Sequence, residues 1–439
     1  MKTPHMISGR LPLIGHLVSY LTRQDVLLRR GAEEGGPVFG LNLMGQPVAV
    51  LTGEEAKTAF FQETDRSLNM NEAYDFLAAI FGEVAFLAEH ETYLNHRPIL
   101  HALFGRQRMA GYHQVMVDVI QEWLDGLGEE GEMELTAETV ELVKEVAGRC
   151  FLGGEINQQL GKEFWKAYDD LSRSMDPVLP PHWPLPKFIR RDRAKRFVRD
   201  VLAPLVYERR ENPVDDPFQL LVEVRLKDGE LPAEETIVQL LMALLFAGHE
   251  TTAGQAAWTV IQLIQHPEYL ARMREEVDRE LGEGQPFQQS TLRKLTHVKL
   301  AVEETARMRP SAETIMRTAE QDLVIGDTVV PAGWMVQTAT AVDHFREDVF
   351  TNPYQYDPLR FSRKRREDRG EKHALIGFGG GLHKCAGMNF AKNEMTIIAA
   401  LLFKDYQLEI TSGEPTVRRG LGSSRPSKTT VRYWKRERA

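Results

Sequence analysis

Cysteine is scarce in this chain of 439 residues, which contains only Cys150 and Cys385. Two cysteines are too few for the disulfide framework of a small secreted domain. No segment with the charged, apolar and small-residue regions of a signal peptide opens the sequence. We therefore expect the protein to be cytoplasmic.

Long apolar runs and an excess of basic residues are lacking as well. The longest apolar run, 237–248, is well short of the roughly 20 residues that span a bilayer, so it predicts a buried helix and no transmembrane anchor. The formal net charge is −9 and the pI is about 5.9. Because a nucleic-acid binder presents a basic face or stripe, we expect no nucleic-acid partner and a small molecule instead.

Internal repeats and Gly/Ser linkers are also absent, so we expect a single domain over residues 1–439. Alternating residues predict a hairpin over 38–51, turning at Gly45-Gln46, and another over 323–336, turning at Gly326-Asp327 and Ala332-Gly333. Most of the remainder follows the helical period, in the ranges 115–127, 137–150, 194–210, 232–265, 268–281 and 389–403. The fold class is therefore mainly α with small β-sheets, including a small N-terminal β region.

One of the cysteines follows three consecutive glycines. Residues 378–387 read Phe-Gly-Gly-Gly-Leu-His-Lys-Cys-Ala-Gly, and a helical pattern begins near Met388. Glycines allow unusual backbone conformations and let a flat ligand approach the main chain. Backbone N–H groups and the next helix N-terminus would stabilise a thiolate at Cys385. An inert buried cysteine is the alternative, and zinc fits poorly because no second cysteine lies within ligand spacing.

A polar segment interrupts the long helix predicted over 232–265. It reads Ala247-Gly248-His249-Glu250-Thr251-Thr252, and buried polar groups are costly unless they are hydrogen-bonded. The Thr251 hydroxyl can donate a hydrogen bond to a carbonyl one turn earlier. Next to a glycine, this bond would open a local groove in the helix, where a diatomic ligand and waters could bind. A kinked core helix with satisfied threonine hydroxyls is the alternative. We expect His249 to be a packing residue rather than a metal ligand.

These two segments resemble motifs of the cytochrome P450 family. The cysteine loop is similar to the haem-binding signature Phe-x-x-Gly-x-x-x-Cys-x-Gly, which implies haem b as cofactor and Cys385 as the proximal iron ligand. The other loop and helix positions that the resemblance places at the haem are Phe378, Gly379, Gly381, His383, Gly387 and Gly248. It also implies the triangular fold of this family, with the long central helix over the haem.

The polar helix segment is similar to the family motif in which an acid precedes two threonines. The resemblance implies that Glu250 relays protons and that Thr251 orients dioxygen. Peroxide-driven relatives lack this acid–alcohol pair, so its presence favours a monooxygenase that uses O2 as co-substrate. A haem protein without turnover, such as a gas sensor or electron carrier, is the alternative from another class and would not need Thr251.

A buried ionic triad is implied further along the chain. Glu304 and Arg307 are spaced i,i+3 in a helical stretch, which alone indicates an ordinary surface ion pair. The later segment Pro358-Leu359-Arg360-Phe361 is similar to the family's Pro-x-Arg-Phe. Together they imply a triad of Glu304, Arg307 and Arg360 that fixes the geometry of the cysteine loop.

Haem propionates need cationic or strongly donating partners, and the resemblance supplies four. Arg317 follows Met308-Arg309-Pro310 at the family's distance for a propionate arginine. Tyr93 and Arg97 resemble Trp-x-x-x-Arg, with tyrosine in place of tryptophan. His383 stands where most members have arginine, and histidine donates less strongly.

Electrons have to come from an external partner, because the chain has no flavin or iron–sulfur signature. The resemblance implies a ferredoxin or flavodoxin-type protein. Lys384 and the run 363–366, Arg-Lys-Arg-Arg, predict a docking surface for an acidic partner, although a solvated basic turn gives the same pattern.

The expected substrate is apolar: a sterol, a terpenoid or a fatty acyl chain. The segment 73–83 resembles the substrate side of the sterol 14-alpha-demethylase branch, and so does His383-Lys384-Cys385. The sequence departs from that branch at His249-Glu250-Thr251-Thr252, so sterol 14-alpha-demethylation is kept as an alternative to hydroxylation in general. The pocket residues expected from these segments are Tyr74, Phe76, Phe81 and Ala247.

Overall fold

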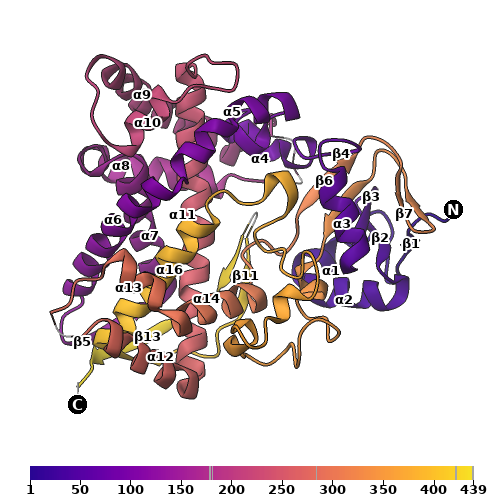
Figure 1. Ribbon diagram of the computed structural model, residues 1–439. Coiled ribbons are helices and arrows are strands. Elements are labelled where there is room, and N and C mark those ends of the chain that lie inside the picture. Colours follow the sequence, from indigo (N-terminus) through magenta and orange to yellow (C-terminus); the bar gives the residue numbers. More distant parts are fainter. Residues whose placement is uncertain (177–178, 180, 283, 421–422, 438–439) are drawn as a thin grey trace. The chain divides into compact units, whose positions relative to one another are not determined.

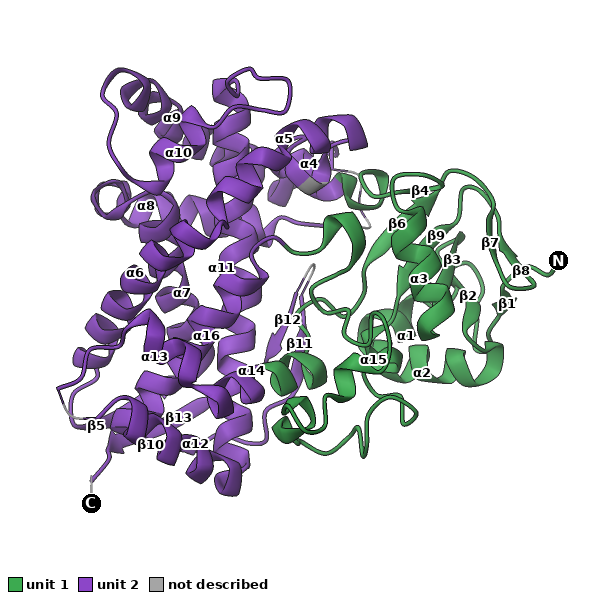
Figure 2. Cartoon of the chain, viewed as in Figure 1, with its two compact units in different colours: residues 1–75, 303–385 green, residues 76–302, 386–439 purple. Residues whose placement is uncertain are grey.

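The computed structural model describes residues 1–176, 179, 181–282, 284–420 and 423–437. The chain divides into two compact units, one of residues 1–75 and 303–385 and one of residues 76–302 and 386–439 (Figure 2). The single domain expected over the whole chain stays a prediction.

The first unit is built on a six-stranded sheet (Figure 1). Its strand order is β1 (His5–Met6), β2 (Val38–Leu43), β3 (Gln46–Leu51), β9 (Met335–Thr338), β6 (Met316–Ala319) and β4 (Leu68–Asn69). A separate hairpin joins β7 (Leu323–Ile325) to β8 (Thr328–Val330). The helices of this unit are α1 (Leu17–Thr22), α2 (Gln24–Gly35), α3 (Gly53–Glu63) and α15 (Thr340–Asp343), with 3-10 turns η3 (Pro358–Phe361), η4 (Glu367–Arg369) and η5 (Gly381–His383).

The β2–β3 hairpin buries both faces, because successive side chains of a strand point to opposite sides. Ala49 and Leu51 join one apolar cluster with Phe60 and Phe61 of α3, whereas Val48 and Val50 join another with residues of α2. The hairpin was predicted, but its turn is at Met44-Gly45 and not at Gly45-Gln46. Both turn residues have positive φ, 53° and 93°, as a tight two-residue hairpin turn requires.

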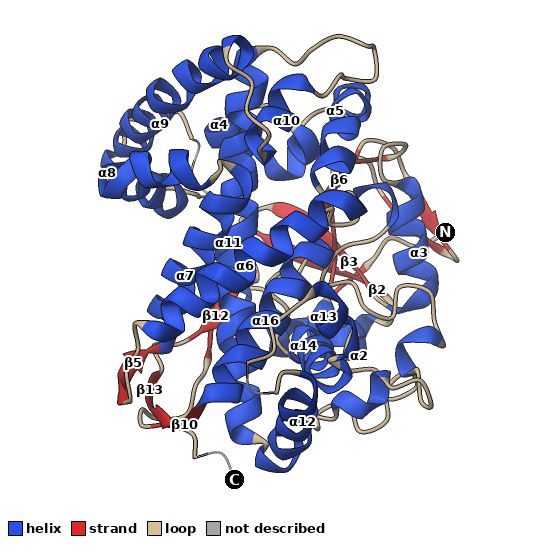
Figure 3. Ribbon diagram, turned by 60° about the vertical axis from the view of Figure 1, so that its left-hand side comes forward, coloured by secondary structure: helices blue, strands red, loops and turns tan. Residues whose placement is uncertain are grey.

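The second unit is dominated by helices (Figure 3). They are α4 (Asp75–Phe81), α5 (His90–Leu103), α6 (Arg106–Asp125), α7 (Leu135–Phe151), α8 (Gly154–Arg173), α9 (Pro186–Glu211), α10 (Pro217–Glu223), α11 (Glu234–Gln265), α12 (Pro267–Glu280), α13 (Gln289–Lys294) and α16 (Met388–Asp405), with η2 (Ala85–Leu87). The helix α14 (Thr296–Met308) runs from this unit into the first, and η1 (Glu72–Tyr74) immediately precedes α4. The strands are β5 (Glu130–Glu134), β10 (Tyr406–Ile410), β11 (Val417–Arg419), β12 (Ser424–Pro426) and β13 (Thr430–Lys435).

The helix α11 runs through the second unit and packs against α7, α9 and α16. It is the one described helix that is long and apolar enough to cross a membrane, but 61% of its 18-residue window is buried inside the protein. That burial is typical of a core helix. Its middle, residues 247–252, is the exception and is less completely buried.

Candidate haem-thiolate site

The cysteine loop has a backbone that requires glycine. Gly379 and Gly381 have φ of +71° and +63°, which L side chains rarely adopt. A Cβ on Gly380 would lie 3.0 Å from the Phe61 ring, so this aromatic side chain approaches the loop closely. The three glycines therefore let the chain turn tightly beside α3.

Main-chain hydrogen bonds hold this loop. Gly379 N donates to Ile376 O at 2.8 Å, and Cys385 N donates to Phe378 O at 2.9 Å. Cys385 is exposed, and α16, capped by Gly387, begins three residues further along the chain. Cys150, in contrast, is completely buried in α7, where burial raises its thiol pKa. The accessible thiol is thus the one on the glycine loop.

Arg317 is a buried cation in β6. It is 1% exposed, its guanidinium donates to Thr64 Oγ1 at 3.2 Å, and it lies 5.1 Å from the Phe60 ring centre. Burial lowers the pKa of Arg317 and the charge of Asp65 acts in the opposite direction, but no ion pair of Arg317 is formed among the described residues. A buried cation is costly without an anionic partner. This donor therefore fits a haem propionate, as the exposed thiol in the same unit fits the iron.

His383 has an acidic partner that the sequence did not reveal. Its Nε2 donates to Asp65 Oδ2 at 2.7 Å, and both side chains are nearly buried. Asp65 follows α3 in a left-handed conformation with φ of +67°. One ring nitrogen of His383 is therefore committed to Asp65, and the predicted propionate contact of His383 stays a prediction.

The triad residues lie together and are completely buried. Glu304 receives two hydrogen bonds from Arg307, both 2.8 Å long, and Arg360 Nε lies 3.1 Å from each of its carboxylate oxygens. Arg360 also bonds the Thr351 carbonyl and Glu367 at 2.8 Å. The charges are thus satisfied on several sides, as a buried ionic group requires.

Tyr93 and Arg97 lie one turn apart on α5, in the second unit. Tyr93 is 5% exposed and Arg97 is half-buried, and no described carboxylate pairs with Arg97. Spaced i,i+4, the two side chains share one face of the helix. The predicted propionate role of this pair stays a prediction.

The middle of α11 has an accessible face. Ala247 is exposed and Gly248, Glu250 and Thr251 are half-buried, between two stretches that are almost wholly buried. Thr251 Oγ1 donates to Ala247 O at 2.8 Å, which is the back-bond that the sequence predicted. The small residues and the threonine thus open one side of an otherwise buried helix.

Two basic side chains flank Glu250. His249 Nε2 lies 3.6 Å from Oε1, and Arg425 Nη1 of β12 lies 3.8 Å from Oε2. The pKa of Glu250 is lowered, chiefly by His249, while burial acts in the opposite direction. His249 is 1% exposed, and its Nδ1 donates to Leu245 O at 2.7 Å. It packs within the core of this unit.

The predicted pocket residues have different surroundings. Tyr74, in the first unit, accepts a hydrogen bond from Met316 N at 3.1 Å. In the second unit, Phe76 is half-buried, whereas Phe81 is 1% exposed and packs 5.0 Å from the ring centre of Phe246. Phe246 is half-buried and precedes Ala247. It was not predicted, because in the sequence it is one more apolar residue of a buried helix.

The basic run beyond η3 is mixed. Arg365 pairs with Asp357 and Glu367, while Arg363, Lys364, Arg366 and Lys384 are exposed.

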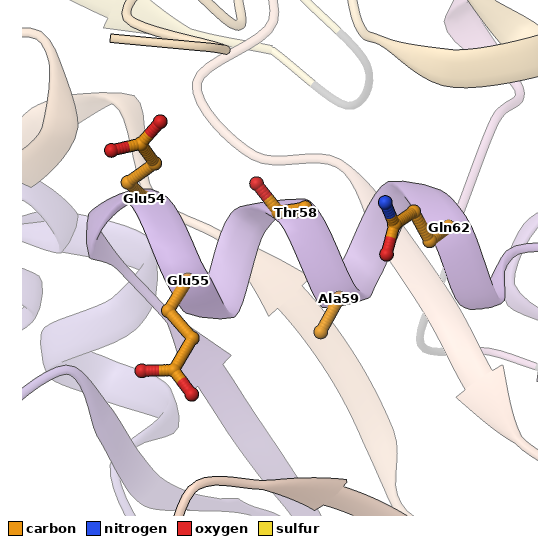
Figure 4. A pocket seen from close by; sticks show the side chains of 5 residues that line it. All are labelled: Glu54, Glu55, Thr58, Ala59 and Gln62. Carbon is orange, nitrogen blue, oxygen red and sulfur yellow. The ribbon is translucent and has the colours of Figure 1, made fainter.

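A shallow hollow of about 530 Å³ lies elsewhere in this unit, along α3 (Figure 4). Its lining residues are Glu54, Glu55, Thr58, Ala59 and Gln62, and none of them belongs to the predicted site.

The model of the cytochrome P450 family matches residues 4–431, and the chain belongs to this family. It is therefore a monooxygenase with haem-thiolate iron as cofactor, a small substrate and an external redox partner.

Known relatives agree with this assignment. A sterol 14alpha-demethylase of Mycolicibacterium vanbaalenii is 32% identical over 93% of this chain and 92% of its own length. One of Mycobacterium tuberculosis is 30% identical, covering 92% and 91%, and lanosterol 14-alpha demethylase of Bos taurus is 28% identical, covering 100% and 89%. The structure of retinoic acid-bound cyanobacterial CYP120A1 superposes with a TM-score of 0.89 at 23% identity, over 99% of both chains. The mainly helical P450 fold is thus confirmed.

Proposed function

We propose that Cys385 is the proximal thiolate ligand of haem b and that the enzyme inserts one oxygen atom of O2 into a C–H bond of an apolar small molecule. The exposed Cys385 thiol, on a loop that its own backbone hydrogen bonds fix, carries the proposal. Haem, when bound, supplies dioxygen activation, which a thiolate ligand favours by donating electron density. Arg317, His383, Tyr93 and Arg97 would hold its propionates.

We assign proton delivery to α11. The Glu250 carboxylate is partly accessible and borders Arg425 and His249, so it can exchange protons with the solvent. Thr251 is accessible too, and its hydroxyl can exchange the Ala247 carbonyl for another acceptor. Together the acid and the alcohol would pass protons to the oxygen-binding side of the haem.

A sterol-type substrate is the narrower proposal. The curated relatives named above are sterol demethylases, which supports a sterol over a terpenoid or a fatty acyl chain. The apolar residues Phe76, Phe246 and Ala247 supply accessible apolar surface in the second unit. The similarity to these relatives supports removal of a 14-alpha-methyl group as the specific reaction. The alternative reaction is hydroxylation without loss of carbon.

The ligand assignment is tested by spectroscopy. Purified protein loaded with haem, reduced and exposed to carbon monoxide should show the absorption of a thiolate-ligated iron. Cys385→Ser should abolish that absorption, while Cys150→Ser, which alters only a buried cysteine of α7, should keep it. A Cys385→Ser protein with the unchanged spectrum would refute the assignment.

The substrate is tested by titration with a panel of sterols, terpenoids and fatty acids, scored by the high-spin shift of the haem. Sterols should give the tightest binding, and product analysis with a reductase system then separates demethylation from hydroxylation. A shift caused only by small, highly charged ligands would contradict an apolar pocket.

For the electron donor we propose a ferredoxin or flavodoxin-type protein that binds near Lys384, and for the enzyme a cytoplasmic location. The exposed cations Arg363, Lys364 and Arg366 support an acidic partner.

A further inference from the structure

His344 occupies a buried position at the end of α15, in the unit that carries the cysteine loop. It is 1% exposed, and both of its ring nitrogens have main-chain partners. His344 Nδ1 donates to Arg307 O at 2.9 Å, and Ile376 N donates to His344 Nε2 at 2.9 Å. The ring thus connects α14 to the segment that leads into the cysteine loop.

The two partners determine the tautomer. A carbonyl oxygen only accepts, so the proton is on Nδ1, and a main-chain N–H only donates, so Nε2 carries the lone pair. Burial lowers the pKa of His344 from 6.5 to about 3, which keeps the ring neutral at physiological pH. Both hydrogen bonds therefore persist under ordinary conditions.

The segment beyond Ile376 is closely tied to the ligand loop. Ile376 O accepts from Gly379 N, and Phe378 O accepts from Cys385 N. A Cβ on Gly377 would lie 3.6 Å from the His344 ring and 3.5 Å from Pro310, so the segment packs against this imidazole. Two main-chain hydrogen bonds thus link the segment that begins at Ile376 to Cys385, and a displacement of Ile376 would reach the cysteine through them.

The other side of the ring is equally well anchored. Arg307, which binds Glu304 with one side of its guanidinium, donates through Nη1 to the His344 carbonyl at 2.7 Å. Arg307 and His344 are therefore joined by two reciprocal hydrogen bonds. No hydrogen bond of the triad side chains themselves reaches residues 376–385, and His344 supplies this connection among the described residues.

We propose that His344 is a positioning residue that connects the Glu304–Arg307–Arg360 triad to the Cys385 loop and so fixes where the sulfur lies. This inference rests on the proposed role of Cys385. The segment is also held further back, where Lys57 Nζ bonds Glu371 and the His373 carbonyl, both at 2.9 Å. Loss of the His344 side chain should therefore displace the Cys385 loop locally, while the preceding residues Glu371 and His373 stay bound to Lys57.

Two substitutions separate the two hydrogen bonds of the ring. In His344→Gln the side-chain oxygen can reach the Nε2 position and accept from Ile376 N. In His344→Asn the amide nitrogen can replace Nδ1 and donate to Arg307 O, but nothing reaches Ile376. Both variants keep a polar side chain of lower volume at the same site, so their difference reports on the Ile376 bond.

The haem-loaded proteins are compared by the reduced carbon monoxide spectrum, the reduction potential and amide exchange of the peptide containing Ile376. We expect His344→Asn to lose most of the thiolate absorption, to shift in potential and to exchange faster at Ile376, with His344→Gln close to the wild type. Leu202→Ala, which opens the buried core of α9 in the other unit, should lower stability without these changes.

The outcomes distinguish this inference from the proposed function. If the wild type lacks the thiolate absorption, the role of Cys385 fails, whatever the variants do. If the wild type has it and His344→Asn keeps the spectrum, potential and exchange rate, or if Leu202→Ala loses the same signals, His344 is not a positioning residue.

Discussion

At the scale of single residues, hydrogen-bond partners decide what each polar side chain can do. Thr251 and Thr259 stand on the same helix and make the same back-bond, with Oγ1 donating at 2.8 Å to Ala247 O and to Gln255 O. They differ in exposure, because Thr259 is 1% exposed whereas Thr251 lies on the accessible face. Of these two threonines, only Thr251 is therefore accessible enough for the proposed proton transfer.

Replacement of Thr251 by alanine should uncouple the enzyme. We expect product formation to fall on the order of 10²-fold, as when a general acid–base group is lost, while reductant is still consumed and hydrogen peroxide appears. The free energy of unfolding should change by less than about 0.5 kcal/mol, because the side chain is accessible. Product, peroxide and reductant are measured together.

Thr259→Ala is the matched control for this experiment. It removes an identical but buried back-bond, so it should cost about 1 kcal/mol of stability and leave the ratio of product to reductant unchanged. Equal uncoupling in both variants would exclude a specific role for Thr251.

His344 makes stability depend on pH. Its pKa is about 3 in the folded protein against 6.5 for an exposed histidine, so the unfolded chain binds the extra proton as the pH falls. Its contribution is complete above pH 6.5 and declines below it, by about 2 kcal/mol between pH 7 and pH 5. Denaturant unfolding at several pH values measures this slope.

In His344→Gln this contribution should be absent, since glutamine does not titrate. The carboxylates titrate in both proteins, so the difference between the two stability curves isolates the histidine. Parallel curves between pH 7 and pH 5 would show that His344 is not held neutral.

At the scale of elements, the triad joins α14 to η3 in the unit that carries Cys385. Glu304→Ala should leave the buried Arg307 guanidinium without a carboxylate and Arg360 with Glu367 alone, and it should cost about 3–5 kcal/mol. Thermal or denaturant unfolding measures the loss. The exposed pair of Arg199 and Glu235 is the control, and Arg199→Ala should have little effect because both side chains are about half exposed. A small loss for Glu304→Ala would mean that the triad contributes no rigidity.

Elements with a clear period were predicted well. The helical ranges expected over 137–150 and 232–265 correspond to α7 and α11, since their apolar residues repeat at the helical spacing. The strand β9 was expected to belong with the hairpin of β7 and β8, but it lies between β3 and β6 of the large sheet. The β3–β9 pairing joins residues 287 positions apart, such as Val48 and Met335, and local alternation cannot indicate such a partner.

At the scale of the whole molecule, the chain carries a net charge of −9. The unit that carries Cys385 nevertheless exposes Lys384, next to it in the sequence, and the cations Arg363, Lys364 and Arg366. Because opposite charges steer association, Lys364→Glu together with Lys384→Glu should lower the association rate of an acidic electron donor about tenfold at low salt. Stopped-flow reduction measures the rate, and added salt should shrink the difference.

Arg196→Glu, an exposed charge reversal on α9, is the control for net charge. If it slows electron transfer as much as the double reversal does, the effect comes from overall charge and not from a docking surface around Lys384.

The sequence alone determined the mainly helical class, the glycine loop before Cys385 and the acid–threonine pair, because each depends on residues close together in the chain. Tertiary structure decided the partners of these residues. Asp65 beside His383 and Arg425 beside Glu250 stand 318 and 175 positions from the residues that they contact. A short motif carries no information about such a neighbour, since only the folded backbone brings the two side chains within hydrogen-bonding or ion-pairing distance.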